Sequence, residues 1–228
     1  LIAQTPIEPR DHSRLLVFDR LRNTVNHHHF YQLPDFLEEG DLLVMNDSRV
    51  IPARLIGHAI DSAGSVEILL LRRISPNVWE CLGKPGKKLF AGARIVFGGT
   101  LEADVLSVGD NGLIFIKLSD DSLIETIGNI PLPPYIKKPL KEFARYQTVY
   151  AGQGEGTVDK NGSVASPTAG LHFTDELMGR LVKINVEKAF VTLHIGLDTF
   201  RPVRVDDPRT HQIHQEFWEI TDATAQAI

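Results

Sequence analysis

Residues 161–174 read NGSVASPTAGLHFT, and residues 188–200 read KAFVTLHIGLDTF. Small residues, hydroxyl groups and the imidazoles of His172 and His194 are gathered in these two segments, which we expect to lie side by side. A hydrophobic core does not need such chemistry, because a buried polar group without a partner costs about 1–3 kcal/mol. The two segments therefore predict a site for a polar ligand.

The residues between these segments predict a helix. Thr174 is a suitable N-cap, and Asp175 and Glu176 follow in the first turn, where the helix dipole favours acids. Apolar side chains then recur at helical spacing, as Leu177, Met178, Leu181 and Val182.

After the helix, apolar and polar residues alternate, which predicts a strand with one apolar face. The apolar positions are Val191, Leu193, Ile195 and Leu197. A loop, helix and strand in this order belong in an α/β sheet, and such sheets bind ligands beyond the carboxyl ends of their strands. His194 and Thr199 lie toward that end, and His172 lies at the helix entrance, where an anion is favoured.

Between Gly57 and Ile130 the pattern changes to short strands separated by turns, including the hairpin signal Asn111-Gly112. Five segments predict strands, and ARLIGHAI at residues 53–60 is a candidate sixth. The five are SVEILLLRRI (65–74), NVWECLG (77–83), ARIVFGG (93–99), LEADVLSV (101–108) and GLIFIKLS (112–119). Such a series predicts a small barrel or sandwich. IPLPPYI (130–136) then predicts an extended connector. We therefore expect a β domain at residues 57–130, inserted into a discontinuous α/β domain of residues 1–56 and 131–228.

The composition restricts the setting of the protein. The 228 residues include one cysteine, Cys81, so no internal disulfide forms, which suits a reducing cytosol. No apolar run approaches the roughly 20 residues of a membrane span. We expect a cytoplasmic protein without membrane attachment, and we favour a monomer. The final residues TDATAQAI resemble a capped helix cut short, so we expect this chain to be part of a longer polypeptide.

The net charge of −5 argues mildly against a general nucleic-acid binder. Two local groups of basic residues occur nevertheless. They are Lys84, Lys87 and Lys88, and then Lys137, Lys138, Lys141 and Arg145. An ordinary solvated surface explains them equally well.

Two polar clusters near the N-terminus are further candidates. Residues 10–14 read RDHSR, which suits a carboxylate or phosphate, although a surface turn with weak local ion pairs is the favoured interpretation. Residues 46–49 read NDSR and interrupt the apolar run LLVM, with Arg54 following. These residues suit a turn or a binding site equally well.

Three other motifs are weaker. His211-x-x-His214-x-Glu216 suggests a metal, but no third strong ligand lies nearby, so a hydrogen-bonding or acid/base pair is favoured. The glycines of residues 152–156 lack the spacing of a dinucleotide site and predict a loop. The run at residues 27–29, three histidines, also predicts a loop. These residues together support an α/β enzyme with a histidine-containing polar site, and they leave its substrate open.

Several segments taken together resemble the S-adenosylmethionine:tRNA ribosyltransferase-isomerases of queuosine biosynthesis. They occur in the order found in that family and cover most of residues 1–220. The segments are LIAQTPIEPRDHSRLLV (1–17), GDLLVMNDSRVIPARL (40–55), IPLPPYI (130–136), RYQTVYA (145–151), GSVASPTAGLHFT (162–174), AFVTLHIGLDTFRPV (189–203) and HQIHQEFWEI (211–220).

The resemblance implies an α/β sandwich with an inserted small β-barrel domain. It also implies transfer and isomerisation of the ribosyl group of S-adenosylmethionine onto 7-aminomethyl-7-deazaguanine at the tRNA anticodon wobble position. The products are epoxyqueuosine, adenine and methionine. S-adenosylmethionine is then a consumed substrate, tRNA is the partner, and no permanently bound cofactor or metal is expected.

The resemblance also suggests roles for individual residues. Acid/base candidates are His172 and His194, with His214 and Glu216 in support. The candidates for binding the methionine carboxylate or RNA phosphates are Arg10, Arg14, Arg49 and Arg54. Asn46 and Asp47 are candidates for binding polar groups of the ribose or base. Tyr146 and Tyr150 are candidates for stacking on a base, with core packing as the alternative. Further substrate-binding candidates are Asp11, Thr168, Gly196 and Thr199.

Three features depart from the family pattern. The family usually has glycine where this chain has Asp198. The loop from Gly152 to Asn161 is longer than in the family, and we interpret it as a surface insertion. The family sequences continue past the position of Ile228. Two other functions therefore stay open. One is a non-catalytic RNA- or nucleotide-binding remnant, and the other is an α/β enzyme acting on a small anionic metabolite.

Overall fold

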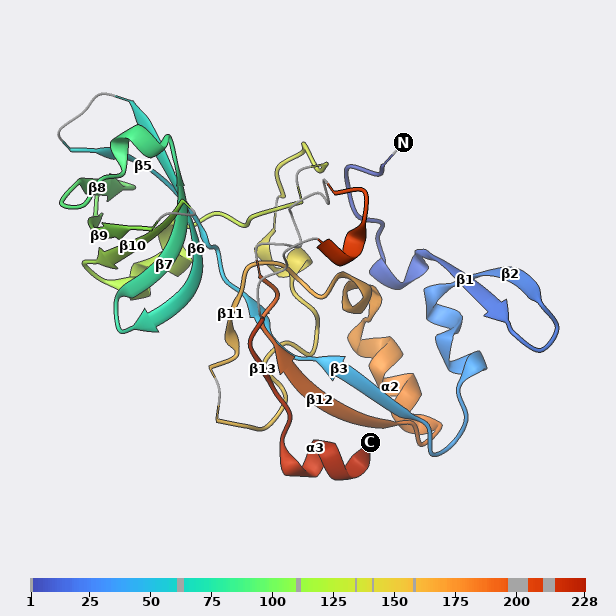
Figure 1. Ribbon diagram of the computed structural model, residues 1–228. Coiled ribbons are helices and arrows are strands. Elements are labelled where there is room, and N and C mark those ends of the chain that lie inside the picture. The colour runs from blue at the N-terminus through green and yellow to red at the C-terminus, as the bar shows by residue number, and fades with distance from the viewer. Residues whose placement is uncertain are drawn as a thin grey trace.

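The computed structural model describes residues 2–60, 64–109, 112–133, 135–140, 142–157, 159–196, 205–210 and 216–228. Figure 1 shows a β-barrel on one side of the molecule and a mixed α/β part on the other. The chain enters the barrel after the strand labelled β3 and returns along the connector at residues 128–140. The barrel is therefore inserted into the chain of the α/β part.

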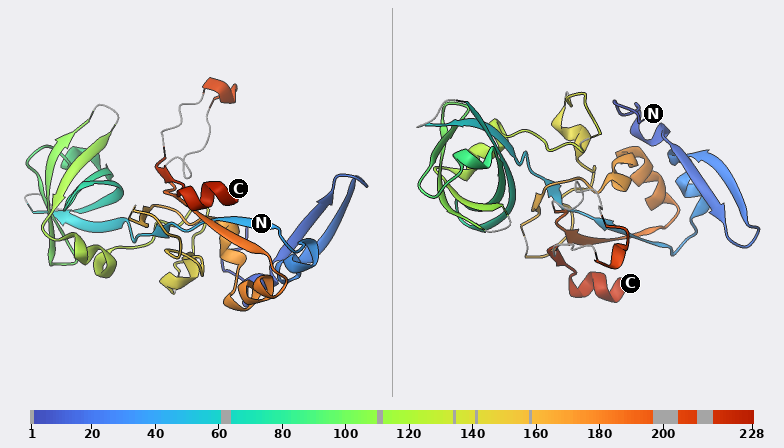
Figure 2. Two further views of the ribbon diagram at one scale, coloured as in Figure 1. Left: turned by 90° about the horizontal axis from the view of Figure 1, so that it is seen from below. Right: turned by 45° about the horizontal axis from the view of Figure 1, so that its top comes forward.

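The barrel consists of six antiparallel strands. They are β5 (Arg54–Ala59), β6 (Ser65–Ser75), β7 (Val78–Lys84), β8 (Arg94–Phe97), β9 (Leu101–Val108) and β10 (Leu113–Leu118). The strand order is β10-β7-β6-β5-β8-β9, and pairing of β9 with β10 closes the barrel. All six predicted segments form strands, and the choice between a barrel and a sandwich is decided in favour of a barrel (Figure 2).

The barrel forms because its strands alternate between inward apolar and outward polar residues. On β5, Leu55, Gly57 and Ala59 are buried, whereas Ile56 and His58 are exposed. The largest fully buried side chains of the interior are Leu55, Ile68, Leu70, Ile95, Phe97, Leu101, Ile116 and Leu118. Cys81 lies in the same core, where burial raises the pKa of its thiol.

The α/β part is organised around a three-stranded sheet of order β13-β12-β3. Strand β3 (Leu42–Asn46) runs parallel to β12 (Glu187–Leu193), and β13 (Trp218–Glu219) is antiparallel to β12. Helix α2 (Asp175–Lys183) and helix α3 (Asp222–Ala227) lie on either side of this sheet (Figure 2). The mixed α/β class with an inserted barrel is thus confirmed.

Helix α2 forms as predicted and packs on the sheet. The Thr174 hydroxyl accepts a hydrogen bond from the Leu177 amide at 3.1 Å, which caps the helix. One apolar face is buried in a second core, whose members are Met45, Tyr150, Phe173, Leu177, Met178, Leu181 and Val186. The helix therefore links the turn before it to the parallel strand pair.

Smaller elements complete the structure. They are the hairpin of β1 (Arg14–Asp19) and β2 (Thr24–His29), the parallel pair β4 (Arg49–Val50) and β11 (Asn161–Ser163), and the short helix α1 (Ile124–Ile127). The short 3-10 helices of the described residues are η1 (Arg10–His12), η2 (Phe30–Phe36), η3 (Gly86–Lys88), η4 (Asp121–Leu123), η5 (Phe143–Tyr146), η6 (Thr168–His172) and η8 (Pro208–Thr210). No helix among the described residues is long and apolar enough to cross a membrane.

Two predictions about strands were wrong. The three histidines at residues 27–29 lie on β2 and not in a loop, because the hairpin has mostly exposed faces and leaves no apolar alternation to detect. Strand β12 begins at Glu187 and ends at Leu193, so it is displaced from the predicted apolar set at residues 191–197. Its buried residues are Ala189 and Thr192, and Thr192 is buried because its hydroxyl binds a buried carboxylate.

Candidate active site

The two segments rich in small and polar residues lie side by side at the carboxyl end of β12. The Ile195 amide donates to the Ser163 hydroxyl at 3.0 Å, and the Val164 amide donates to the Ile195 carbonyl at 2.9 Å. Strand β11, which begins this loop, also pairs with β4 directly after β3. The loop and the ends of both parallel strands therefore meet in one region, as expected for an α/β sheet.

Asn46, the last residue of β3, connects the two parallel strands through its side chain. Its amide group donates to the Leu193 carbonyl at 2.9 Å, and its oxygen accepts from the amides of Leu193 and Ser48 at 3.1 and 3.0 Å. The side chain thus continues the hydrogen bonding of the sheet past the last backbone pair. Its role in the described structure is to position the strand ends.

Asp47 is fully buried and its carboxylate is surrounded by donors. One oxygen accepts from the Thr192 hydroxyl at 2.8 Å, and the other accepts from the Gly154 amide at 2.9 Å. The ammonium of Lys160 lies 3.3 Å from the second oxygen and donates to the Thr192 hydroxyl at 2.6 Å. A buried charge needs this complete set of partners to be stable in the fold.

The loop from Gly152 to Asn161 is therefore more than a surface insertion, and that interpretation was wrong for its inner residues. Its backbone binds Asp47 twice, through the amides of Gly152 and Gly154, and Lys160 is buried against the same residue. The side chain of Lys160 is 14% exposed. The loop holds its position because a buried carboxylate requires a cation and backbone donors.

His194 follows β12 and is mostly surrounded by protein. Its ring lies against Gly162, where an added Cβ would approach the ring nitrogen Nδ1 to 2.6 Å, and its centroid is 5.8 Å from that of Phe217. Burial lowers the pKa of His194, opposed in part by a hydrogen bond to the backbone of Asp159. Its Nε2 is buried without a hydrogen-bond partner among the described residues. A neutral ring with an unpartnered nitrogen is suited to accept a proton.

His172 lies at the other end of the same loop, in η6. Its Nδ1 is 2.7 Å from the Ser13 hydroxyl, and its ring centroid is 5.1 Å from that of Phe30. The N-terminal segment thus fixes this histidine, whereas β11 and Phe217 contact His194. The convergence of both rings on one cavity stays a prediction.

The N-terminal cluster at residues 10–14 is attached to the helix entrance and to the segment before Tyr150. Asp11 is buried and accepts from the Thr174 hydroxyl at 3.1 Å. Arg10 donates to the carbonyls of Gln147 and Ala144 at 3.0 and 3.4 Å. These contacts position the loops, and they leave the exposed Arg14 pointing away from the core.

The other two arginines lie in different places. Arg49, on β4, is exposed beside Gly152. Arg54 lies on barrel strand β5 and forms an ion pair with Glu67 at 2.9 Å. The four candidate arginines therefore do not form one cluster.

The two candidate tyrosines are buried, at 6% exposure for Tyr146 and 3% for Tyr150. Burial raises the pKa of each phenol to about 12. The Tyr150 ring packs between Phe173 and Phe190, with centroid distances of 5.9 and 6.1 Å. Core packing accounts for their positions, so base stacking by these rings is not carried further.

The remaining candidates are distributed along the same edge. Thr168 is exposed in η6, and the Gly196 amide donates to the exposed Glu216 carboxylate at 2.7 Å. Thr199 and His214 lie outside the described residues, as does Asp198. No cluster of three or more histidine, cysteine, aspartate or glutamate side chains that suits a metal occurs in the described part of the chain.

Several buried hydroxyls near this region lack hydrogen-bond partners among the described residues, including those of Ser48, Thr148 and Ser166. Ser48 follows Asp47, and Ser166 lies in the loop between the two histidines. A polar ligand can supply the missing partners, because most buried polar atoms in proteins are satisfied.

Sequence reasoning missed the supporting residues Lys160, Thr192, Ser13 and Gln147. The side chain of Gln147 forms two hydrogen bonds with the backbone of Val50, at 2.7 and 3.1 Å. A signal for Lys160 existed, since a carboxylate in an apolar strand requires a cation. The other three act through hydrogen bonds between segments far apart in the sequence, which no local pattern shows.

The fold and the site define the class of the protein: a mixed α/β protein with an inserted barrel and a polar, histidine-containing site at parallel strand ends. The whole chain, residues 1–228, matches the family of the queuosine biosynthesis protein and belongs to that family.

Two curated relatives are each 47% identical to the chain. Both are named S-adenosylmethionine:tRNA ribosyltransferase-isomerase, from Caldanaerobacter subterraneus subsp. tengcongensis over 233 residues and from Dehalococcoides mccartyi over 232 residues. Each alignment covers 100% of this chain and 66% of the relative. The chain thus spans somewhat less than two thirds of the length of these relatives.

A solved structure is also similar. The crystal structure of an S-adenosylmethionine tRNA ribosyltransferase from Thermotoga maritima is 33% identical in sequence, with a TM-score of 0.38. The match covers 100% of this chain and 60% of that structure.

Proposed function

We propose that this protein transfers and isomerises the ribosyl group of S-adenosylmethionine onto 7-aminomethyl-7-deazaguanine in tRNA. The reaction gives epoxyqueuosine and releases adenine and methionine. One observation carries the proposal most strongly. In a member of the queuosine biosynthesis family, the ends of β3 and β12 bring a half-buried histidine of lowered pKa, His194, beside the loop that contains Ser166, whose buried hydroxyl lacks a partner among the described residues.

The chemistry of this substrate fits the neutral imidazole. The sulfonium of S-adenosylmethionine acidifies the adjacent ribose C5′ hydrogens, so a general base is needed to remove one of them, and a neutral imidazole can serve. His194 supplies an Nε2 without a partner among the described residues, at a lowered pKa that keeps the ring neutral near pH 7. His172 is the second acid/base candidate, and the Asp47–Lys160 pair fixes the strand ends near His194.

The proposal extends to the wider organisation of the protein. The discontinuous part, residues 1–56 and 131–228, forms an α/β sandwich, and residues 57–130 form the barrel domain, whose first strand, β5, begins three residues earlier at Arg54. The protein acts in the cytoplasm as a monomer, with S-adenosylmethionine as a consumed substrate and tRNA as its partner.

An adenine-release assay tests the roles of the two histidines. The full chain is incubated with S-adenosylmethionine and with tRNA that carries the 7-aminomethyl-7-deazaguanine base, and adenine is measured by chromatography. We expect His172→Ala and His194→Ala each to lower the rate by about 100-fold or more, the usual effect of losing an acid/base group.

The matched control is His58→Ala, because His58 is exposed on the outer face of barrel strand β5. This variant should keep the wild-type rate. Circular dichroism confirms that each variant is folded. If both site variants released adenine at the wild-type rate, the assignment of the base would be wrong.

A further inference from the structure

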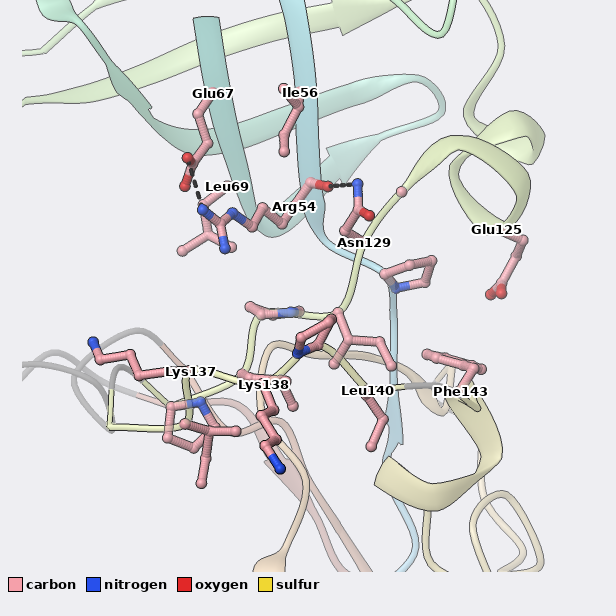
Figure 3. A pocket seen from close by; sticks show the side chains of 18 of the residues that line it. Arg54, Ile56, Glu67, Leu69, Glu125, Asn129, Lys137, Lys138, Leu140 and Phe143 are labelled. Atoms are coloured by element: carbon pink, nitrogen blue, oxygen red, sulfur yellow. Dashed lines mark hydrogen bonds and ion pairs between the residues drawn. The ribbon is translucent and has the colours of Figure 1, made fainter. Parts of the chain in front are cut away.

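A groove of about 1010 Å³ lies between the barrel and the connector that returns from it (Figure 3). One wall is the outer face of the barrel at β5, β6 and β7. The other wall is the proline-rich segment at residues 128–140, together with Phe143. The groove is separate from the histidine-containing loop, because neither His172 nor His194 lines it.

The barrel wall is built by strand register. Arg54 lies opposite Leu69, Ile56 lies opposite Glu67, and Glu67 lies opposite Lys84, so outward side chains of three adjacent strands share one surface. Glu67 binds both neighbouring cations, with Arg54 at 2.9 Å and Lys84 at 3.4 Å. Two cations thus share one carboxylate on this wall.

The connector wall adds two further cations. Lys137 and Lys138 are exposed, and they follow a proline-rich segment that turns where the Ile136 amide donates to the Pro133 carbonyl at 2.9 Å. Figure 3 shows both lysines across the groove from Arg54, with Glu125 toward the opposite side. Proline keeps the backbone of this wall stiff, so its lysines are displayed at low entropic cost.

The charge of the groove is opposite in sign to that of the chain. Its lining includes the cations Arg54, Lys84, Lys137 and Lys138 and the carboxylates Glu67 and Glu125, whereas the chain has a net charge of −5. An acidic protein repels polyanions over most of its surface, so a local cationic groove is where a polyanion binds.

We propose that this groove binds the sugar–phosphate backbone of the RNA substrate, an inference that rests on the proposed function. Its volume is at the upper limit of pockets for small molecules, about 300–1000 Å³. Its two walls come from the barrel and from the connector, so one RNA backbone contacts both parts of the protein. Phosphate contacts of this kind position the RNA and do not read its sequence.

The first test removes two lysines of the connector. Binding of an RNA hairpin corresponding to a tRNA anticodon arm is measured by fluorescence anisotropy at several salt concentrations. We expect K137Q/K138Q to bind about tenfold more weakly, with the slope of log affinity against log salt reduced in magnitude by about 1.5. The control K183Q/K188Q removes the same charge from exposed positions on α2 and β12 and should bind as the wild type does.

The second test is a variant that should bind RNA more tightly. Glu67→Gln removes the carboxylate that Arg54 and Lys84 share, so both cations become available to phosphates. We expect this variant to bind the hairpin about threefold more tightly, with a steeper salt dependence. A loss of folding does not increase affinity, so this result separates a binding role from a structural one.

Ribosyl transfer to tRNA, measured in parallel, separates this inference from the proposed function. If the wild type transfers the ribosyl group but K137Q/K138Q and Glu67→Gln bind RNA as the wild type does, the groove proposal is overturned and the function stands. If RNA binding depends on the lysines but no transfer occurs, the function fails and the groove stands. Lysine-dependent binding of polyglutamate without RNA binding overturns the groove proposal in favour of an acidic protein partner.

Discussion

Asp47 is fully buried, and its partners come from two segments, the loop at residues 152–161 and strand β12. Lys160, Thr192 and Gly154 supply a cation, a hydroxyl and an amide. The attraction between the charges is strong in such surroundings, but it compensates for the loss of hydration only while both charges are present. The strand ends of the site therefore depend on this pair.

Asp47→Asn should lower the free energy of unfolding by about 3 kcal/mol, because it leaves the ammonium of Lys160 buried without its carboxylate. Urea denaturation monitored by circular dichroism measures the change. The control Asp35→Asn alters an exposed residue and should change stability by less than about 0.5 kcal/mol. The double variant D47N/K160M should lose less free energy of unfolding than the sum of the losses of its two single variants. If Asp47→Asn and Asp35→Asn lost equal stability, the structural role of the Asp47–Lys160 pair would be refuted.

His194 makes stability depend on pH. Burial lowers its pKa from the ordinary value of 6.5, so the folded protein resists a proton that the unfolded chain accepts. This contribution is complete above about pH 6.5 and is lost as pH falls through the window between the unfolded and folded pKa values. Urea denaturation between pH 8 and pH 5 should show a steeper loss of stability for the wild type than for His194→Gln. Parallel pH profiles would contradict this account of the ring.

Site residues were predictable from sequence when their chemistry was local. The two histidines stand in segments too polar for a core, and Asp47 interrupts an apolar strand. Lys160 was interpreted as part of a surface loop because only the folded structure brings it to the carboxylate. Tyr150 illustrates the opposite error, since an aromatic residue beside a site motif is explained by core packing against Phe173.

At the scale of elements, the short strands of the barrel depend on close approach between neighbours. Gly57 lies on β5 where that strand pairs with Val66 of β6 and Phe97 of β8. An added Cβ would collide with the Val96 carbonyl oxygen and the Phe97 ring. Glycine at this position therefore lets β5 and β8 close the barrel.

Gly57→Ala should lower the free energy of unfolding by about 2–3 kcal/mol, the usual cost of forcing extra volume into a packed core. Gly86→Ala is the matched control, because no atom lies within 4 Å of the position of its added Cβ. Thermal and urea denaturation of both variants measure the difference. Equal stability of the two variants would show that β5 and β8 have room to separate.

Elements were predicted well where burial imposed a period. All six barrel strands and helix α2 followed from alternation, turns and the Thr174 cap. The hairpin of β1 and β2 was missed because neither strand alternates apolar and polar residues: β1 contains the continuous apolar run at residues 15–18, and β2 is mostly polar. The bounds of β12 were displaced because Thr192 is buried by a hydrogen bond, which hydrophobic patterns do not detect.

At the scale of the whole molecule, the barrel and the α/β part carry different tasks in the proposed function. The parallel strand ends hold the acid/base candidates, and the groove beside the barrel supplies cations for the RNA backbone. Because the barrel is inserted directly after β4, the polar segment at residues 46–49 connects the end of β3 to the groove wall at Arg54. The separation of base chemistry from backbone binding allows one enzyme to act on a single nucleotide of a large RNA.

A labelling experiment tests the proposed reaction most directly. The full chain is supplied with tRNA carrying 7-aminomethyl-7-deazaguanine and with S-adenosylmethionine labelled either in the ribose or in the methyl group. We predict that the ribose label appears in the tRNA and that the methyl label stays with released methionine. Methyl label in the tRNA, or no label from either substrate, would contradict the proposed ribosyl transfer.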